Sequence, residues 1–165
     1  MSTTAREVID DFLAQRRIAL VGASHDEKDF SRLVLRELRQ RGYEVLPVNP
    51  KVERIDDLTC YPRVQDIPGS VGGAIVMTPP EVTRQVVADC VAAGIPRVWM
   101  HKGGGTGAVD EQAIELCHRQ AIAVVEGECP LMFLQNTGWV HRAHAWFKKL
   151  RHTYPRYQSE SHASR

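Results

Sequence analysis

The stretch RIALVGAS, residues 17–24, decides the fold class of this protein. Its residues 18–21 form a short apolar run, and Gly22 ends that run. Such a run is typical of a strand inside a parallel sheet, because helices cover both faces of that strand. The segment 31–41 then carries apolar residues at helical spacing and stops at Gly42. A strand, a glycine turn and a helix together indicate a βα unit.

The same unit recurs along the chain. The expected strands are 17–22, 43–48, 73–77, 97–100 and 121–125, and the expected helices are 3–13, 31–41, 81–93 and 110–120. Strands and helices that alternate through short connections form right-handed crossovers into a parallel sheet. We therefore predict an α/β, doubly wound Rossmann-type domain with a mainly parallel five-stranded sheet and helices on both faces.

The composition argues against several classes of protein. Lys plus Arg number 21 and Asp plus Glu number 20, so a net charge of +1 gives no global reason to bind nucleic acid. No apolar run approaches the roughly 20 residues of a membrane helix, and the N-terminus does not resemble a signal peptide. The four cysteines lie far apart without a CxxC pair, which disfavours a zinc ribbon or a disulfide scaffold and favours a cytoplasmic location.

The C-terminal part departs from the repeating pattern. We expect one domain over residues 1–151, which ends in an amphipathic helix at 139–151, and a polar, disordered tail at 152–165. The apolar side of that helix offers a surface for a homodimer contact. His141 and His144 lie on adjacent turns of it, but no third ligand at suitable spacing accompanies them, so we predict no metal site.

The ligand site of an open parallel sheet lies beyond the carboxyl ends of its strands, where the strand order reverses. Small, polar or basic residues follow all five expected strands, which suits an anionic and partly extended ligand. The segments at this edge are Gly22-Ala23-Ser24, Asn49-Pro50-Lys51, Thr78-Pro79-Pro80, His101-Lys102-Gly103-Gly104-Gly105 and Glu126-Gly127-Glu128-Cys129-Pro130.

The first of these turns is the expected place for a pyrophosphate, which would lie on backbone N–H groups at a helix N-terminus. Gly22 allows close approach of the backbone, Ser24 and Ser31 add hydroxyl groups, and Arg32 adds a positive charge. The alternative is purely structural: Gly22 then serves only a tight turn, and Ser31 only caps the helix.

The residues after the second strand disfavour NAD. An NAD site has Gly-x-Gly-x-x-Gly in the first turn and an acidic residue at the end of the second strand. This chain has only Gly22 in the turn and Asn49-Pro50-Lys51 after the second strand. A cation there suits a phosphate near the ribose, as in CoA or NADP, although a solvated surface lysine remains the alternative.

Several segments together carry a resemblance over about the first 130 residues. They are Ile18–Ser24, Gly42–Lys51, Tyr61-Pro62, Asp66–Pro68, Thr78–Pro80, Ala93–Met100 and Cys129-Pro130. In this order and spacing the chain resembles the stand-alone CoA-binding proteins, which are similar to the N-terminal domain of the succinyl-CoA synthetase α subunit. The resemblance implies a Rossmann-type fold and coenzyme A or an acyl-CoA as the ligand.

The resemblance also implies a role for particular residues. Those implied to hold the pyrophosphate are Gly22, Ala23, Ser24, Ser31 and Arg32. Pro50 and Lys51 are implied to lie at the 3′-phosphate end of the ligand. The residues implied to contact the adenine or the pantetheine arm are Thr78, Pro79, Pro80, Met100, His101 and Lys102, with Cys129 at the far end of the groove.

The resemblance brings no catalytic residue, because the phosphorylated histidine of the synthetase belongs to a domain outside the match. Cys129 with His101 is the one nucleophile pair to consider, but Glu126 and Glu128 oppose a thiolate there. We therefore expect a non-catalytic CoA sensor or carrier, with no membrane or nucleic-acid partner. The alternatives are a small NADP-dependent enzyme and an interaction protein whose nucleotide site is vestigial.

Overall fold

The computed structural model describes residues 5–103 and 107–134. In chain order its elements are α1 (Ala5–Leu13), β1 (Arg17–Val21), α2 (Phe30–Gln40), β2 (Glu44–Val48), β3 (Arg54–Ile55), β4 (Leu58–Thr59), the 3-10 helix η1 (Val64–Asp66), β5 (Gly73–Val76), α3 (Pro80–Ala92), β6 (Arg97–His101), α4 (Glu111–Arg119), β7 (Ala123–Glu128) and the 3-10 helix η2 (Pro130–Met132).

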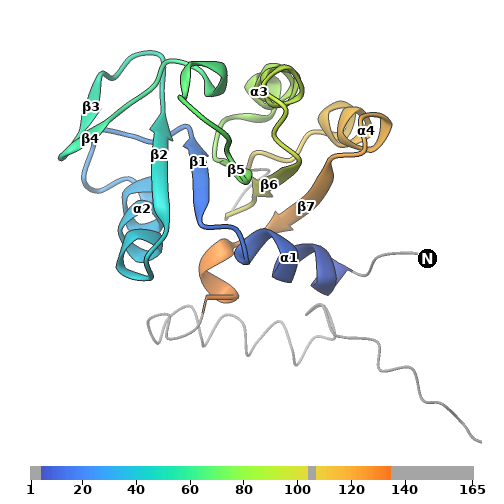
Figure 1. Ribbon diagram of the computed structural model, residues 1–165, viewed down its shortest axis with the longest axis horizontal. Helices are drawn as coiled ribbons and strands as arrows, with labels where there is room; N and C mark the ends of the chain where they lie inside the picture. The colour runs from blue at the N-terminus through green and yellow to red at the C-terminus, as the bar shows by residue number, and fades with distance from the viewer. Residues whose placement is uncertain (1–4, 104–106, 135–165) are drawn as a thin grey trace, which may run out of the picture.

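Five strands form one sheet in the order β2-β1-β5-β6-β7, and every neighbouring pair is parallel. Figure 1 shows helices α1 and α2 on one side of this sheet and α3 and α4 on the other. The predicted doubly wound Rossmann-type fold is therefore confirmed. The chain passes from β1 to β2 on one side and later returns to β5 on the other side of β1, so the order reverses between β1 and β5.

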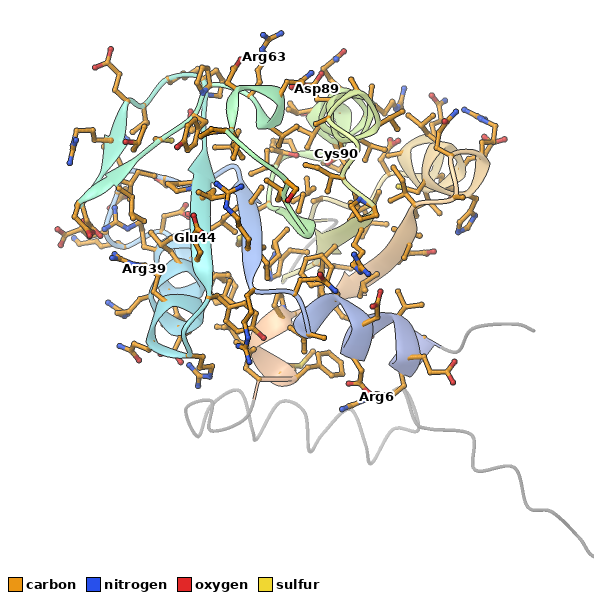
Figure 2. All side chains as sticks on the ribbon, in the orientation of Figure 1. Arg6, Arg39, Glu44, Arg63, Asp89 and Cys90 are labelled. Carbon is orange, nitrogen blue, oxygen red and sulfur yellow. The ribbon has the colours of Figure 1, made fainter. Side chains whose placement is uncertain are left out.

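Each face of the sheet has its own buried core, because successive strand residues point to opposite faces. On one face Val21, Val76 and Met100 pack against α3 and α4. On the other, Leu20 and Trp99 pack with residues of α1 and α2. Figure 2 shows side chains filling the space between the sheet and its helices. Full cover on both faces explains why the strands are continuous apolar runs.

The expected elements and the observed ones differ most at two places. The β3–β4 hairpin was not predicted, because strands of two residues are too short for any periodicity. The last strand was predicted at 121–125 and is observed at Ala123–Glu128. Ala121 has a φ of +54° and belongs to the turn after α4, while pairing with β6 carries β7 on to Glu128, past a register shift at Met100 and His101.

Some expectations concern residues that the structure does not describe. The predicted helix at 139–151, its homodimer surface and histidine pair, and the tail at 152–165 all lie outside the described residues. Within residues 5–103 and 107–134, no helix is long and apolar enough to cross a membrane. The same residues contain no group of three or more His, Cys, Asp or Glu side chains placed to hold a metal ion.

Candidate nucleotide site at the strand-order reversal

A cavity of about 320 Å³ lies at the carboxyl edge of the sheet, where the strand order reverses. Its lining residues come from the ends of β1, β5 and β6, from the start of α2 and from the loop after β6. They are Gly22, Asp29, Phe30, Met77, Thr78, Pro79, His101, Gly107 and Ala108. The position is the one at which open parallel sheets bind their ligands.

The cavity brings together only some of the predicted site residues. Four of them line it: Gly22, Thr78, Pro79 and His101. Met100 is fully buried in the α3–α4 core instead, and Lys102 is exposed. Cys129 is half-buried and packs against the core on the α1–α2 face. Five further lining residues were not predicted from the sequence: Asp29, Phe30, Met77, Gly107 and Ala108.

Two glycines let backbone segments meet around this cavity. Gly22 has a φ of +89°, and a Cβ on it would lie 2.9 Å from the Met77 carbonyl oxygen. Gly107 has a φ of +60°, and a Cβ on it would overlap the His101 carbonyl oxygen. Both positions therefore require glycine for packing as well as for conformation. The structural role that we left open for Gly22 is real, and it shapes the cavity.

The N-terminus of α2 is already capped by a carboxylate of the chain. Asp29 is the N-cap residue, and its Oδ1 accepts hydrogen bonds from the Ser31 N–H at 2.8 Å and the Ser31 hydroxyl at 2.6 Å. The Ser31 oxygen in turn accepts the Ser24 N–H at 3.0 Å. Ser31 is thus not the cap, and its hydroxyl bonds tie the β1–α2 turn together.

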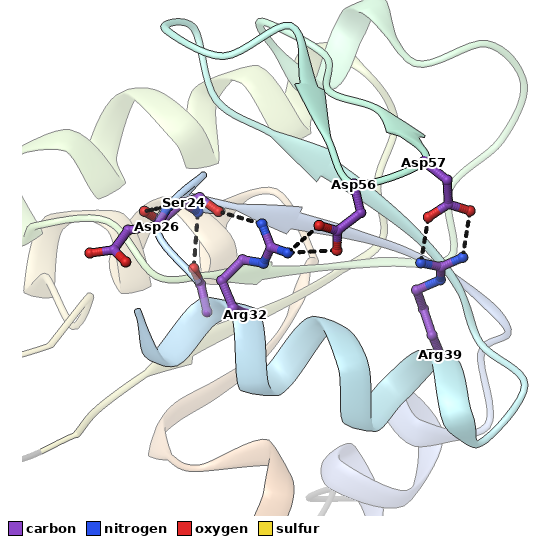
Figure 3. A network of polar contacts seen from close by, with 7 residues as sticks. Ser24, Asp26, Arg32, Arg39, Asp56 and Asp57 are labelled. Carbon is purple, nitrogen blue, oxygen red and sulfur yellow. Dashed lines mark hydrogen bonds and ion pairs between the residues drawn. The ribbon is translucent and has the colours of Figure 1, made fainter. Parts of the chain in front are cut away.

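The next residue of α2, Arg32, lies beside the same turn. Its Nη1 is 3.5 Å from the Ser24 carbonyl oxygen, and its Nη2 is 2.5 Å from both carboxylate oxygens of Asp56 in the β3–β4 turn. Figure 3 shows Arg32 between Ser24 and Asp56. Asp56, which is 24 positions from Arg32 in the chain, is thereby held beside the turn where the ligand phosphates were expected.

The loop after β2 is joined to the end of β1 by a side-chain amide. Asn49 donates its Nδ2 hydrogen to the Ala23 carbonyl oxygen at 2.8 Å, and its Oδ1 accepts the Lys51 N–H at 2.9 Å. Pro50 and Lys51 are exposed beside this contact. Asn49 therefore holds the backbone of Lys51 close to the first turn while the ammonium group stays in solvent.

His101 is the buried polar side chain of the cavity. It is 8% exposed, and its ring stacks on Phe30 with a centroid distance of 5.2 Å. Its Nε2 is buried and has no hydrogen-bond partner among the described residues. Burial lowers the pKa of the imidazole, which favours the neutral ring at neutral pH. A neutral imidazole offers a ligand one donor and one acceptor.

Asp110 anchors the far end of the loop that contributes Gly107 and Ala108. Its carboxylate accepts the Ala113 N–H at 2.9 Å as the N-cap of α4. It also accepts hydrogen bonds from two N–H groups of Arg84 on α3. The Arg84 Nε lies 3.0 Å from Oδ1 and 3.1 Å from Oδ2, and the Arg84 Nη2 lies 3.0 Å from Oδ2. One carboxylate thus joins α3, α4 and the cavity wall.

Replacing Asp110 with alanine is expected to lower the free energy of unfolding at neutral pH by about 1 to 2 kcal/mol, the usual cost of losing an N-cap. Asp110→Asn is the control, because asparagine also caps helices, and it should cost less. The bond from Arg84 holds the pKa of Asp110 below 3.8. The carboxylate therefore stabilises the fold above that pH, and the difference from wild type should shrink as the pH falls through the folded-state pKa. Urea unfolding at several pH values measures this; a difference that grew in acid would contradict it.

A parallel sheet with a glycine turn after β1 and a cavity at the reversal of strand order defines the class of Rossmann-type nucleotide-binding domains. Within that class, residues 16–135 match the family described as CoA binding domain. The chain belongs to this family, and the resemblance seen in the sequence is confirmed.

Relatives of known sequence fall into two kinds. The α subunit of the ADP-forming acetate–CoA ligase II of Pyrococcus furiosus is 29% identical over 129 residues, which are 74% of this chain and 28% of that subunit. The chain thus spans less than a third of this ligase subunit. The uncharacterized protein YneT of Bacillus subtilis is 24% identical over 130 residues, which are 78% of this chain and 93% of YneT.

Solved structures share the fold. A hypothetical protein from Pyrococcus horikoshii superposes with a TM-score of 0.71 at 27% identity, covering 78% of this chain and 88% of that one. The dinucleotide-forming acetyl-coenzyme A synthetase 1 of Candidatus Korarchaeum cryptofilum, solved with phosphate and ADP, superposes with a TM-score of 0.59 at 29% identity. The match covers 68% of this chain and 25% of the synthetase chain.

Proposed function

We propose that this chain binds coenzyme A or an acyl-CoA at the carboxyl edge of its sheet and acts as a binding module without catalysis of its own. The observation that carries the proposal is the cavity at the strand-order reversal, in a chain of the CoA binding domain family.

The residues at this edge fit the two chemically different halves of CoA. Among the described residues that line the cavity, Asp29 is the only Asp, Glu, Lys or Arg, and its carboxylate is bound within the turn. A volume of about 320 Å³ is small for a whole cofactor. The uncharged pantetheine arm therefore suits the cavity, where His101 has hydrogen-bonding capacity to offer. The phosphates suit Arg32 and Lys51, which are cations outside it.

Titration of the purified protein with CoA, acetyl-CoA, NADH and NADPH tests the proposal. A ligand that binds only the folded state stabilises it by about 2.7 kcal/mol at a hundredfold excess over Kd. We expect a rise in the unfolding temperature with CoA or acetyl-CoA. No shift with either at millimolar concentration excludes the proposal, and a shift with NADPH alone supports the NADP-dependent alternative.

The charge of Lys51 is expected to select for the 3′-phosphate. Lys51→Glu should weaken CoA binding by about tenfold or more and dephospho-CoA binding much less, because only CoA carries the phosphate that the reversed charge repels. Isothermal titration calorimetry of both ligands measures the difference. Arg54→Glu is the matched control, a charge reversal three residues along at another exposed position. Equal losses for CoA and dephospho-CoA would place Lys51 elsewhere on the ligand.

A further inference from the structure

The two arginines of α2 that hold the β3–β4 turn do so in different ways. Arg39 binds Asp57 as a fork, with Nη1 and Nη2 each 2.9 Å from its own carboxylate oxygen. Arg32 places a single nitrogen, Nη2, 2.5 Å from both oxygens of Asp56. Figure 3 shows the two pairs along the same helix. In the fork, two N–H groups each bond one carboxylate oxygen, which is the geometry in which guanidinium and carboxylate match best. In the Arg32 pair only Nη2 contacts Asp56, and the Nε and Nη1 donors do not.

The surroundings of the two pairs differ as well. The Arg32 side chain is only 10% exposed and reaches the Ser24 carbonyl oxygen in the β1–α2 turn. The Arg39 side chain is 38% exposed and lies about two helical turns further along α2. Arg32 is therefore a covered cation beside the first turn, and Arg39 is a more exposed cation further along the wall of the same hollow.

We propose that Asp56 sets the affinity of this site for anionic ligands, because its carboxylate occupies Arg32 until a ligand phosphate replaces it. The proposal rests on the function proposed above. A phosphate and a carboxylate are both acceptors for guanidinium donors, so they compete for the same group. Asp56 is half-exposed, with 51% of its side chain accessible, and can move into solvent when displaced.

The hairpin can release Arg32 without leaving the helix. Asp57 is the next residue in the chain, and its fork to Arg39 keeps the turn attached to α2. Ile55, just before the turn, is 1% exposed and packs in the core of the α1–α2 face. The exchange at Arg32 therefore requires a side-chain movement of Asp56 and no unfolding of the hairpin.

Asp56→Asn removes the competing charge and keeps the backbone. Asp56 has a φ of +54°, and asparagine tolerates this left-handed conformation as well as aspartate does. Asp57→Asn is the matched control, because it removes the same charge from the neighbouring residue, whose partner is Arg39 and not Arg32. Unfolding temperatures of both variants show whether either one loosens the fold.

The experiment measures the Kd of CoA, of pantetheine and of inorganic pyrophosphate for the wild type, Asp56→Asn, Asp57→Asn, Arg32→Gln and the Arg32→Gln/Asp56→Asn double variant. We expect Asp56→Asn to bind CoA and pyrophosphate about three- to tenfold more tightly. Its pantetheine affinity should stay unchanged, because pantetheine carries no phosphate. Asp57→Asn should resemble the wild type, because asparagine keeps one oxygen that accepts from Arg39 and the buried Ile55 still anchors the hairpin. The gain from Asp56→Asn should vanish in the Arg32→Gln background.

Two failures are distinguishable. If the wild type binds CoA but Asp56→Asn binds it no more tightly than Asp57→Asn, Asp56 is only a structural tether and the inference is wrong while the proposed function stands. If the wild type does not bind CoA, the proposed function fails. The pyrophosphate series then decides the inference alone: tighter binding by Asp56→Asn supports it, and equal binding overturns it.

Discussion

Replacing Gly22 with alanine is expected to lower the free energy of unfolding by about 2 to 5 kcal/mol. A residue with a Cβ at a φ of +89° costs about 1 to 2 kcal/mol. The new methyl group would also lie 2.9 Å from the Met77 carbonyl oxygen and 3.0 Å from its carbonyl carbon. These atoms follow a central strand and cannot move aside cheaply, so overpacking adds a further 1 to 3 kcal/mol. Urea unfolding at equilibrium measures the sum.

The same substitution is expected to weaken CoA binding, because relief of the clash separates the ends of β1 and β5 that line the cavity. Gly42→Ala is the control. Gly42 has a similar φ of +83°, but a Cβ there meets nothing within 4 Å. It should cost only the conformational strain, about 1 to 2 kcal/mol, and leave CoA binding unchanged. Equal losses of stability in the two variants would show that β1 and β5 tolerate the methyl group.

Replacing Trp99 with alanine is expected to lower the free energy of unfolding by about 3 to 5 kcal/mol. The Trp99 side chain is fully buried in the middle of β6. Its ring contacts the rings of Phe12 in α1 and Phe133 just after η2 edge-on, with centroid distances of 5.3 Å and 5.9 Å. Alanine would remove both aromatic contacts and leave a large cavity. Because whole domains are stable by only about 5 to 15 kcal/mol, the loss should lower the unfolding temperature markedly in calorimetry.

Trp99→Phe separates packing from hydrogen bonding. The Trp99 Nε1 donates to the Glu128 carbonyl oxygen at 2.8 Å, at the end of β7. Phenylalanine keeps most of the ring contacts but loses this hydrogen bond, which costs about 0.5 to 1.5 kcal/mol. The phenylalanine variant should therefore be clearly more stable than the alanine variant. If both lost the same stability, the hydrogen bond rather than the packing would carry the effect.

The fold was predictable because its evidence is repeated along the chain. Strands β1, β2, β5 and β6 are apolar runs that are mostly buried on both faces, and the helical stripes that follow cover those faces. Small errors arose where local pattern is weakest. The β3–β4 hairpin has strands of only two residues, and the end of β7 depends on pairing with β6.

The candidate site was predictable only in part. Chain order brings the strand ends to one edge, so Gly22, Thr78 and His101 were expected together, and the cavity has all three. Met100 was expected at the ligand, but its side chain is buried in the core between the sheet and helices α3 and α4. Asp29 was not expected, although an Asp two residues before Ser31 is a signal for an N-cap that could have been used.

Sequence alone determined the alternation of strands and helices, the glycine after β1 and the cation after β2. The reason is that hydrophobic periodicity and turn conformation depend on residues that are close together in the chain. Tertiary structure decided that Gly22 meets Met77, that Gly107 meets His101 and that Asp56 holds Arg32. These contacts join residues from 6 to 55 positions apart, and they depend on how the loops lie across a finished sheet edge. No local pattern specifies that arrangement, because in the sequence Arg32 and Asp56 do not differ from any other arginine and aspartate until the fold brings them together.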